Sequence, residues 1–235
     1  MSETNELRLI PIAGLPEVRP GDDIAALLAH TGLLVDGDVV VVTQKIVSKA
    51  EGRLVELDHD DRVARTRLVE SESALILRRR GDLVISQTHS GFVCANAGVD
   101  LSNVESGWAA LLPVDPDRSA RRIRDALLHR DGIDVGVVIS DTFGRPWRKG
   151  LVDVAIGCAG VAGVLDLRGT ADSLGRELAV TEVAIADEIA AAAELVMGKA
   201  SGIPAAIVRG VPTDWLRPGS VRDELIRDPH DDLFR

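Results

Sequence analysis

The sequence predicts an α+β protein built around mixed sheets with flanking helices. Two apolar runs, residues 38–43 (DVVVVT) and the segment VVIS from Val137, have the β-branched content of strands buried on both faces. Longer segments with one apolar stripe, clearest at residues 116–132 and 181–198, predict amphipathic helices. With 235 residues, 46% hydrophobic and 27% charged, we expect a globular protein with one domain over residues 1–235, in one or two lobes.

The N-terminal quarter predicts two strands and two short helices. Apolar and polar side chains alternate weakly along residues 7–12, which is typical of a strand. Asp22 or Asp23 can cap a helix that runs to Leu28, since an aspartate oxygen accepts hydrogen bonds from a helix's free N–H groups. After the strand at 38–43, a helix would place the amines of Lys45 and Lys49 on one side. The alternative is two solvated lysines.

The rest of the chain alternates between helices and strands. Residues 62–80 carry apolar residues among Arg and Glu and predict a long amphipathic helix. Strands are expected at 83–86 and 108–114, and a helix from Pro116 to about Gly132. The glycine-rich stretch 152–169 cannot be a single helix and is expected to pack backbone against backbone. The alanine-rich segment 181–198 predicts the clearest helix, and AAIVRG at 205–210 a further strand.

Composition and motifs exclude several classes of function. The net charge of −10, the absence of a basic tract and the 3% aromatic content disfavour nucleic-acid binding. Two isolated cysteines make a zinc site or a disulfide framework improbable. There is no apolar run for a signal peptide or a membrane span, so we expect a cytoplasmic protein with no membrane partner. The sequence also contains no P-loop, Rossmann or GxSxG motif.

The segment VVISDTFGRPWRKG, residues 137–150, is the strongest candidate for a site. Asp141 and Thr142 are expected where the strand ends, and Arg145, Arg148 and Lys149 follow a glycine turn. Oxygen ligands suit a hard cation such as Mg²⁺, and arginine matches phosphate oxygens. A strand, a turn and a solvated basic loop form the alternative interpretation.

A second candidate lies in the small-residue segment 89–103. Gly91 and Gly98 allow the backbone to approach a ligand closely. Asp100 and Asn103 end the segment, and both offer oxygen ligands. An Asx-type turn is the alternative explanation for these two residues.

Six segments in order resemble one family across nearly the whole chain: GLPEVRPGDD, VVVVTQKIVSKAEGR, HSGFVCANAGVDLSNV, SDTFGRPWRKGLVDVAIGCAG, ADEIAAAAELVMGKASGIPAAIVRG and DDLFR. This family is the coenzyme F(420):L-glutamate ligases, the GTP-dependent γ-glutamyl ligases of deazaflavin cofactor biosynthesis. The resemblance implies an F(420)-0 gamma-glutamyl ligase-like fold and an interwoven homodimer. It also implies that the chain is either a stand-alone ligase or the ligase domain of a bifunctional relative that carries a C-terminal nitroreductase-like domain as well.

The resemblance further implies an enzyme that joins L-glutamate to coenzyme F(420)-0 through an acyl phosphate, with GTP as co-substrate. The implied ions are Mg²⁺ or Mn²⁺, two of them, together with K⁺. The positions that match the family's metal ligands are Asp100, Asp141 and Thr142. Those that match its guanine-nucleotide contacts are Leu15, Pro16, Glu17, Val18, Gln44, Lys49 and Asn103.

One departure from the family pattern concerns residues 197–204. The family often has an acidic or amide side chain in this loop, which contacts nucleotide and metal, whereas this chain has Lys199, Ala200 and Ser201. We assign Arg145, Arg148 and Lys149 to phosphate or acidic-substrate binding as a hypothesis. Two other functions stay open: a different metal-dependent phosphate enzyme such as a phosphohydrolase, and a non-catalytic module that binds a deazaflavin or a nucleotide.

Overall fold

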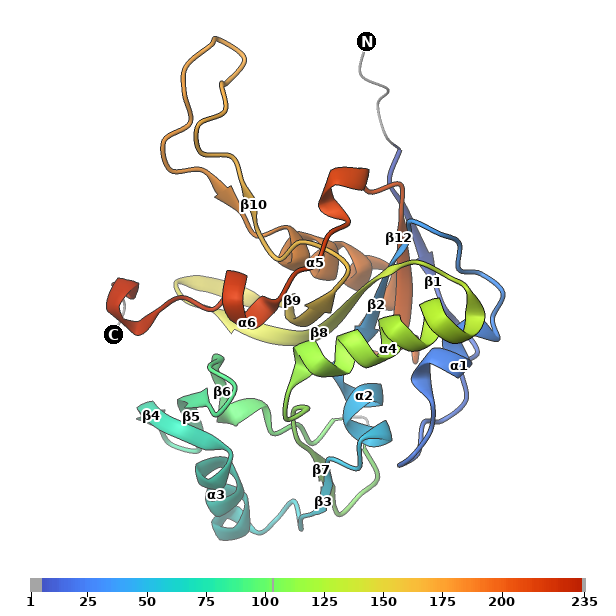
Figure 1. Ribbon diagram of the computed structural model, residues 1–235. Coiled ribbons are helices and arrows are strands. Elements are labelled where there is room, and N and C mark those ends of the chain that lie inside the picture. The colour runs from blue at the N-terminus through green and yellow to red at the C-terminus, as the bar shows by residue number, and fades with distance from the viewer. Residues whose placement is uncertain (1–5, 103, 234–235) are drawn as a thin grey trace.

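A five-stranded mixed sheet forms the centre of the molecule (Figure 1). The computed structural model describes residues 6–102 and 104–233. In spatial order the strands are β1 (Arg8–Pro11), β12 (Ala205–Arg209), β2 (Val39–Thr43), β8 (Gly136–Arg145) and β9 (Arg148–Ala159). The pair β2–β8 is parallel and the other three pairs are antiparallel. The expected α+β class with a mixed sheet is therefore confirmed.

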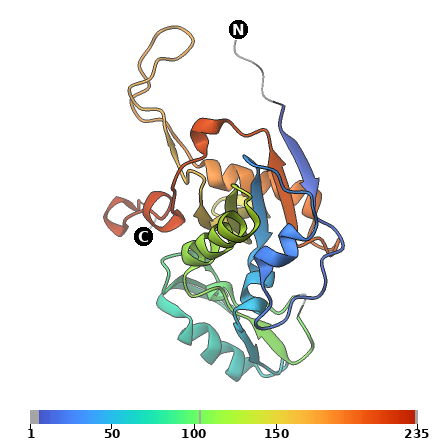
Figure 2. The same cartoon turned by 45° about the vertical axis from the view of Figure 1, so that its right-hand side comes forward.

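Both faces of this sheet are covered, which explains the unbroken apolar runs. The four valines of β2 have no exposed surface, and neither do Val137, Val138 and Ile139 of β8. Helix α4 (Pro116–Asp131) packs on β8 and β9, with α1 (Ile24–Ala29) beside it. Helix α5 (Ile185–Met197) packs on the opposite face, so that Figures 1 and 2 show α4 in front of the sheet and α5 behind it.

The ends of these helices follow the expected capping chemistry. The Asp23 side chain accepts a hydrogen bond from the Ala26 N–H at 3.0 Å and begins α1. Asp115 accepts from Arg118 N–H at 2.9 Å ahead of Pro116, the first residue of α4. Gly132 ends α4 in the left-handed conformation, with φ of 69°, which a glycine adopts without a Cβ clash.

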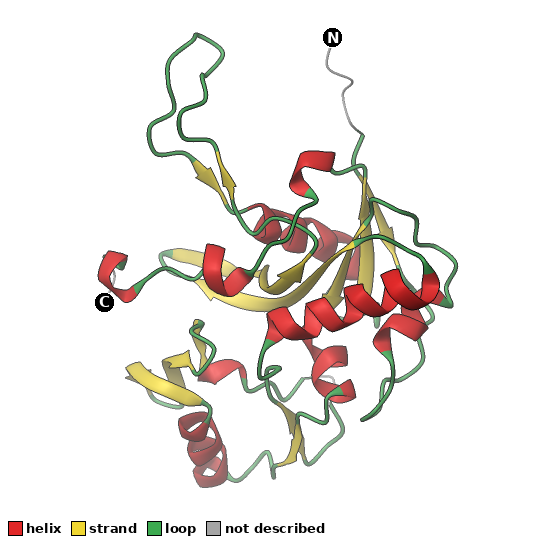
Figure 3. Cartoon of the chain, in the orientation of Figure 1, coloured by secondary structure: helices red, strands yellow, loops and turns green. Residues whose placement is uncertain are grey.

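A smaller lobe is built from residues between β2 and α4, in the lower part of Figure 3. It contains α2 (Gln44–Ala50), the pair β3 (Leu54–Glu56) and β7 (Trp108–Ala110), and helix α3 (Arg62–Ser71). A three-stranded sheet follows α3, made of β4 (Ser73–Arg80), β5 (Leu83–Thr88) and β6 (Val93–Ala95), with the 3₁₀ turn η1 (Asn96–Gly98). Its own small core consists of Val69, Val84 and Ala97.

The C-terminal half adds one projecting hairpin and several short turns. Strands β10 (Leu165–Asp166) and β11 (Glu182–Val183) pair at the base of a long loop that extends away from the body (Figure 1). The 3₁₀ turn η2 (Thr213–Trp215), helix α6 (Val221–Glu224) and the 3₁₀ turn η3 (Pro229–Asp231) complete the described chain. Within that part of the chain, no helix is long and apolar enough to cross a membrane.

Two sequence-based expectations about local structure are wrong. Residues 62–80 do not form one helix, because β4 begins at Ser73 and pairs with β5 across a turn at Gly81. Leu75 and Leu77 are two positions apart, which is the spacing of a strand. Pairing with β5 makes residues 73–80 a strand instead of a continuation of the helix. The strand expected at 108–114 is confined to β7.

The candidate segment 137–150 also differs from expectation. Strand β8 does not end at Asp141 but continues to Arg145, because β9 pairs with it along its whole length. The turn is therefore at Pro146 and Trp147, and Asp141 and Thr142 lie inside a β-ladder. The glycine-rich stretch supplies the partner strand.

Candidate functional site

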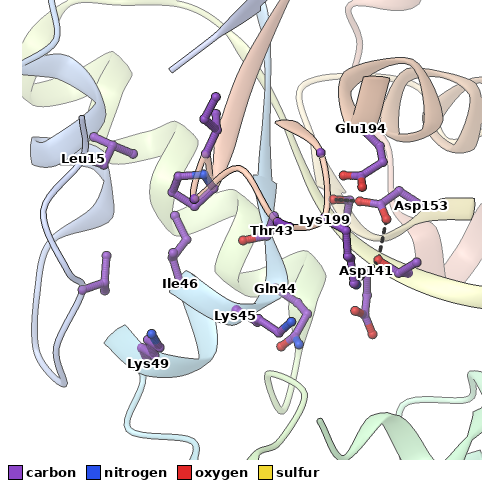
Figure 4. A pocket seen from close by; sticks show the side chains of 18 of the residues that line it. Leu15, Thr43, Gln44, Lys45, Ile46, Lys49, Asp141, Asp153, Glu194 and Lys199 are labelled. Carbon is purple, nitrogen blue, oxygen red and sulfur yellow. Dashed lines mark hydrogen bonds between the residues drawn. The ribbon is translucent and has the colours of Figure 1, made fainter. Parts of the chain in front are cut away.

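A cavity of about 440 Å³ opens where β2 ends, beside the middle of β8, α2 and the loop after α5 (Figure 4). Four separate parts of the chain line it: the turn before α1, the β2–α2 junction, the β8–β9 pair, and the end of α5 with the segment that follows it. The residues that line it are Leu15, Pro16, Glu17, Val18, Thr43, Gln44, Lys45, Ile46, Lys49, Ser140, Asp141, Thr142, Asp153, Glu194, Gly198, Lys199, Ala200, Gly202, Ile203 and Pro204.

The abrupt change from β2 to α2 brings the first turn of that helix to the cavity. Gln44, the first residue of α2, is 1% exposed, and Ser48 Oγ lies 2.8 Å from its Oε1. The same hydroxyl lies 2.6 Å from the carbonyl oxygen of Leu111. A hydroxyl has one hydrogen to donate, so Ser48 can donate to the Leu111 carbonyl and accept from the Gln44 NH₂ group if the amide is turned over. Gln44 is therefore held in the cavity wall by Ser48.

Strand β8 contributes Asp141 and Thr142, and its partner β9 contributes a carboxylate directly opposite Thr142. This carboxylate is Asp153, which is 3% exposed and accepts from Thr142 Oγ1 at 2.7 Å and from Ser140 Oγ at 2.9 Å. Lys199, in the segment after α5, donates from Nζ to Thr142 Oγ1 at 2.6 Å. Figure 4 shows Asp141, Asp153, Glu194 and Lys199 gathered at this end of the cavity.

Asp100 lies on the side of the smaller lobe and reaches the site through Lys45. Its Oδ2 is 2.9 Å from Lys45 Nζ, and its Oδ1 accepts the Ser102 N–H at 2.7 Å. Burial alone raises the pKa of Asp100, but these hydrogen bonds and the Lys45 charge outweigh it, so its pKa is lowered. Asp100 is therefore a carboxylate anion at neutral pH.

Asp141 has the opposite electrostatic character. Burial raises the pKa of Asp141 to about 7, against the lowering effect of the Thr142 N–H, and the charges of Asp100 and Asp153 raise it further. Lys199 opposes that rise. Lys45, which pairs with Asp100, lines the same cavity as Asp141, so these two acids, forty-one positions apart in the sequence, lie at one site. Burial likewise raises the pKa of Glu194, with Asp153 adding to the rise.

These acidic side chains are suitable ligands for a divalent cation. No group of three His, Cys, Asp or Glu side chains in the described ranges 6–102 and 104–233 has the arrangement of a complete metal site. Mg²⁺, however, is commonly held by one or two carboxylates together with phosphate oxygens and water. Asp141, whose ionised form is disfavoured next to Asp100, is the type of ligand that such a cation would stabilise.

The structure gathers most of the residues singled out in the sequence. Leu15, Pro16, Glu17, Val18, Gln44, Lys49, Asp141 and Thr142 line the cavity, and Asp100 pairs with Lys45 of its wall. Lys49 forms an ion pair with Glu17. Arg145 and Arg148 lie at the exposed turn between β8 and β9, outside the cavity lining, and their role stays a prediction. Asn103 lies outside the described residues.

Three charged residues of the site were not assigned to it from the sequence. Asp153 and Glu194 stand in segments interpreted as packing or as helix, and Lys199 was noted only as a departure from the family pattern. One signal was available for Asp153: it is the only charged residue within the apolar run LVDVAIGCA. No sequence signal marks Glu194 as a site residue, because the exposed face of any amphipathic helix carries acids at the same spacing.

Comparison with known proteins shows one family across most of the chain. The sequence profile of a family described as F420-0:Gamma-glutamyl ligase matches residues 14–210. A protein of Methanopyrus kandleri named coenzyme F420:L-glutamate ligase is 46% identical over 249 aligned positions, which cover 97% of this chain and 98% of that protein. Proteins of the same name from Methanothermobacter thermautotrophicus (45% identical, 97% and 99% covered) and Methanocaldococcus jannaschii (39% identical, 98% of each covered) are also similar.

Proposed function

This chain belongs to the F420-0:gamma-glutamyl ligase family, and we propose that it joins L-glutamate to coenzyme F420-0 in a GTP-dependent reaction. The observation that carries the proposal is a cavity lined by Asp141, Lys45 and Lys199, with Asp100 paired to Lys45 beside it. Such a combination of carboxylates and ammonium groups suits a triphosphate and its divalent cation. Further γ-linked glutamates would be added in later cycles.

The proposed chemistry has two steps. In the first, the terminal carboxylate of F420-0 attacks the γ-phosphorus of GTP; a C–O–P linkage forms, and the bond to the leaving GDP breaks. In the second, the amine of L-glutamate attacks the acyl carbon, so that an amide bond forms, orthophosphate leaves and the amine loses a proton. Both steps depend on positioning and on charge neutralisation more than on covalent help from the protein.

The residues of the cavity have distinct parts in this proposal. Asp100 and Asp141 would hold Mg²⁺ or Mn²⁺, which when bound neutralises charge on the transferring phosphoryl group. The turn Leu15–Val18 would cover the nucleotide on the apolar side, and the amide of Gln44 would bind a polar atom of it. Lys49 and Asn103 are further proposed nucleotide contacts, and K⁺ a further ion.

The direct test is mass spectrometry of the deazaflavin after incubation with GTP, L-glutamate and Mg²⁺ or Mn²⁺. We expect a product heavier by one or more glutamyl residues, formed only when both GTP and L-glutamate are present. A phosphohydrolase would release phosphate at the same rate without L-glutamate, and a binding module would release none. Either result would refute the ligase proposal.

We also propose that the protein works as a homodimer in the cytoplasm. Apolar side chains are exposed on two hairpins: Trp147 (83%) and Leu151 (64%) on β8–β9, and Leu174 (78%) and Val180 (85%) on the loop between β10 and β11. Exposed apolar groups of this kind favour burial against a second copy. Light scattering after size-exclusion chromatography measures the mass, and a monomer at micromolar concentration would contradict this part.

Replacing Arg148 with Ala tests the assignment of the exposed turn to acidic-substrate binding. F420-0 carries phosphodiester and carboxylate charges, and an exposed ionic contact contributes up to about 1 kcal/mol. We therefore expect the KM for F420-0 to rise about five-fold, because RT ln 5 is about 1 kcal/mol. Steady-state kinetics at saturating GTP and L-glutamate measure this, with Arg80→Ala at the end of β4 as the matched control. An unchanged KM and kcat would remove the assignment.

A further inference from the structure

Lys199 occupies a special position in the cavity. Helix α5 ends at Met197, and the chain then turns at Gly198, with φ of 61°, so that residue 199 points toward β8. Its Nζ donates to Thr142 Oγ1 at 2.6 Å, and that hydroxyl donates its own hydrogen to Asp153 Oδ1 at 2.7 Å. The Thr142 hydroxyl thus accepts one hydrogen from the ammonium and gives its own hydrogen to Asp153, so the two contacts are compatible.

The surroundings of this ammonium carry more negative than positive charge. Asp153 is buried and is held by two hydroxyl donors, neither of which is a cation. The Lys199 charge lowers the pKa of both Glu194 and Asp141, against burial, which raises both. The ammonium therefore lies within electrostatic reach of acids on α5 and on β8, where a positive charge is needed.

A divalent cation does not fit at Thr142 while Lys199 is there. An ion such as Mg²⁺ must lie about 2.1 Å from its oxygen ligand, and the Thr142 oxygen already accepts the ammonium at 2.6 Å and donates to Asp153. Two cations sharing one hydroxyl oxygen at such distances would repel each other strongly. Asp100 also has an ammonium beside it, that of Lys45 at 2.9 Å. A carboxylate, however, is negatively charged and has further lone pairs for a cation, whereas the neutral Thr142 hydroxyl has already given its hydrogen to Asp153 and a lone pair to Lys199.

We infer that the Lys199 ammonium takes the place of a second divalent cation at Thr142, so that the chain binds its triphosphate substrate with a single divalent ion at Asp141 and Asp100. This inference rests on the proposed GTP-dependent function, and it replaces the two ions that the family resemblance implies. Lysine is a common phosphate ligand and acts there as a compact point charge with three donors. In the ligase reaction it would contact a phosphate oxygen directly.

The number of bound ions tests the inference without any turnover. The full-length protein is titrated with Mn²⁺ in the presence of the non-hydrolysable β,γ-imido analogue of GTP, and free Mn²⁺ is followed by electron paramagnetic resonance. The same titration of the analogue alone gives the ions that the nucleotide binds by itself. We expect one protein-dependent Mn²⁺ per chain, with no magnetic coupling between ions. Two coupled ions on the unaltered protein would overturn the inference, whatever the variants do.

Substitution of Lys199 gives a second readout. Lys199→Gln removes the ammonium and offers an amide oxygen, so we expect a second Mn²⁺ and the appearance of spin coupling. Lys199→Arg keeps the charge and should bind one ion, and so should Lys149→Gln, which removes a lysine charge from the exposed β8–β9 turn. If Lys199→Gln folds, as shown by circular dichroism, and still binds a single ion, the inference fails.

The failures of the two proposals are distinguishable. If the protein forms glutamylated product but binds two ions, the proposed function stands and the role of Lys199 is refuted. If it binds a single ion with the GTP analogue but forms no product, the role of Lys199 stands and the ligase function is refuted. A protein that binds no Mn²⁺ even with the analogue loses both.

Discussion

Replacement of Asp141 with Asn is expected to lower kcat/KM for glutamate-dependent product formation by about a thousand-fold, the upper range for loss of one preorganised electrostatic contact in an active site. The substitution keeps the size of the side chain and the β8–β9 ladder, in which residue 141 pairs with Val154. It removes the negative charge that a divalent cation needs. Since burial already disfavours the carboxylate form, the neutral amide should not destabilise the folded protein.

The pH dependence of cation binding follows from the same group. Burial raises the pKa of Asp141 to about 7 in the metal-free protein, so that proton and cation compete for one carboxylate near neutral pH. The Mn²⁺ affinity should therefore rise as the pH increases from 6 to 8 and should level off above the pKa. Calorimetry in buffers of different ionisation enthalpy measures the proton released, and the Asn variant should show no release.

A matched control separates charge loss at the site from charge loss in general. Asp82→Asn removes a carboxylate from an exposed ion pair with Arg62 in the smaller lobe, and we expect its kcat/KM to stay within about two-fold, as is usual for exposed pairs. If Asp141→Asn keeps full activity, or if both variants lose it equally, the assignment of Asp141 to cation binding is wrong.

Sequence patterns predicted those parts of the fold that local chemistry decides. The apolar run at 38–43, the Asp23 cap and the Pro116 start with the Gly132 end of α4 were all readable, because each carries its own signal within a few residues. Residues 62–80 were misinterpreted because a strand that pairs with a later segment has no local signal of that partner. The end of β8 was misplaced for the same reason, since β9 was not recognised as a strand.

The candidate site shows the same division. Asp141, Thr142, Asp100 and Lys49 stood out from residue type and family resemblance, and the structure places them in or beside one cavity. Asp153 and Lys199 depend on two non-local facts, namely the register of the β8–β9 hairpin and the return of the chain after α5. Hydrogen bonding across a hairpin cannot be read from spacing until the register is known.

Replacement of Asp117 with Ala is expected to lower the free energy of unfolding by about 4 kcal/mol. Asp117 is 6% exposed and lies in the first turn of α4. Its Oδ1 accepts the N–H groups of Cys158 at 2.8 Å and Val221 at 2.9 Å, and its Oδ2 accepts from Arg222 N–H and Ser220 Oγ, both at 3.0 Å. Removal of the carboxylate leaves several donors unpaired, each costing roughly 1–3 kcal/mol when buried.

This carboxylate matters because α4 and β9 approach each other without intervening side chains. A Cβ built on Gly157 would lie 2.3 Å from the carbonyl carbon of Pro116, so that only glycine permits this contact. Water therefore has little room to replace the lost acceptor at Cys158 N–H.

In a chain of this length, about 4 kcal/mol corresponds to a Tm lower by roughly 10 °C, which circular dichroism during heating measures. Asp115→Ala, which removes one exposed cap bond from the same helix, should cost only about 1 kcal/mol. Equal losses for the two variants would show that Asp117 acts merely as a helix cap, and not as the junction of α4, β9 and α6.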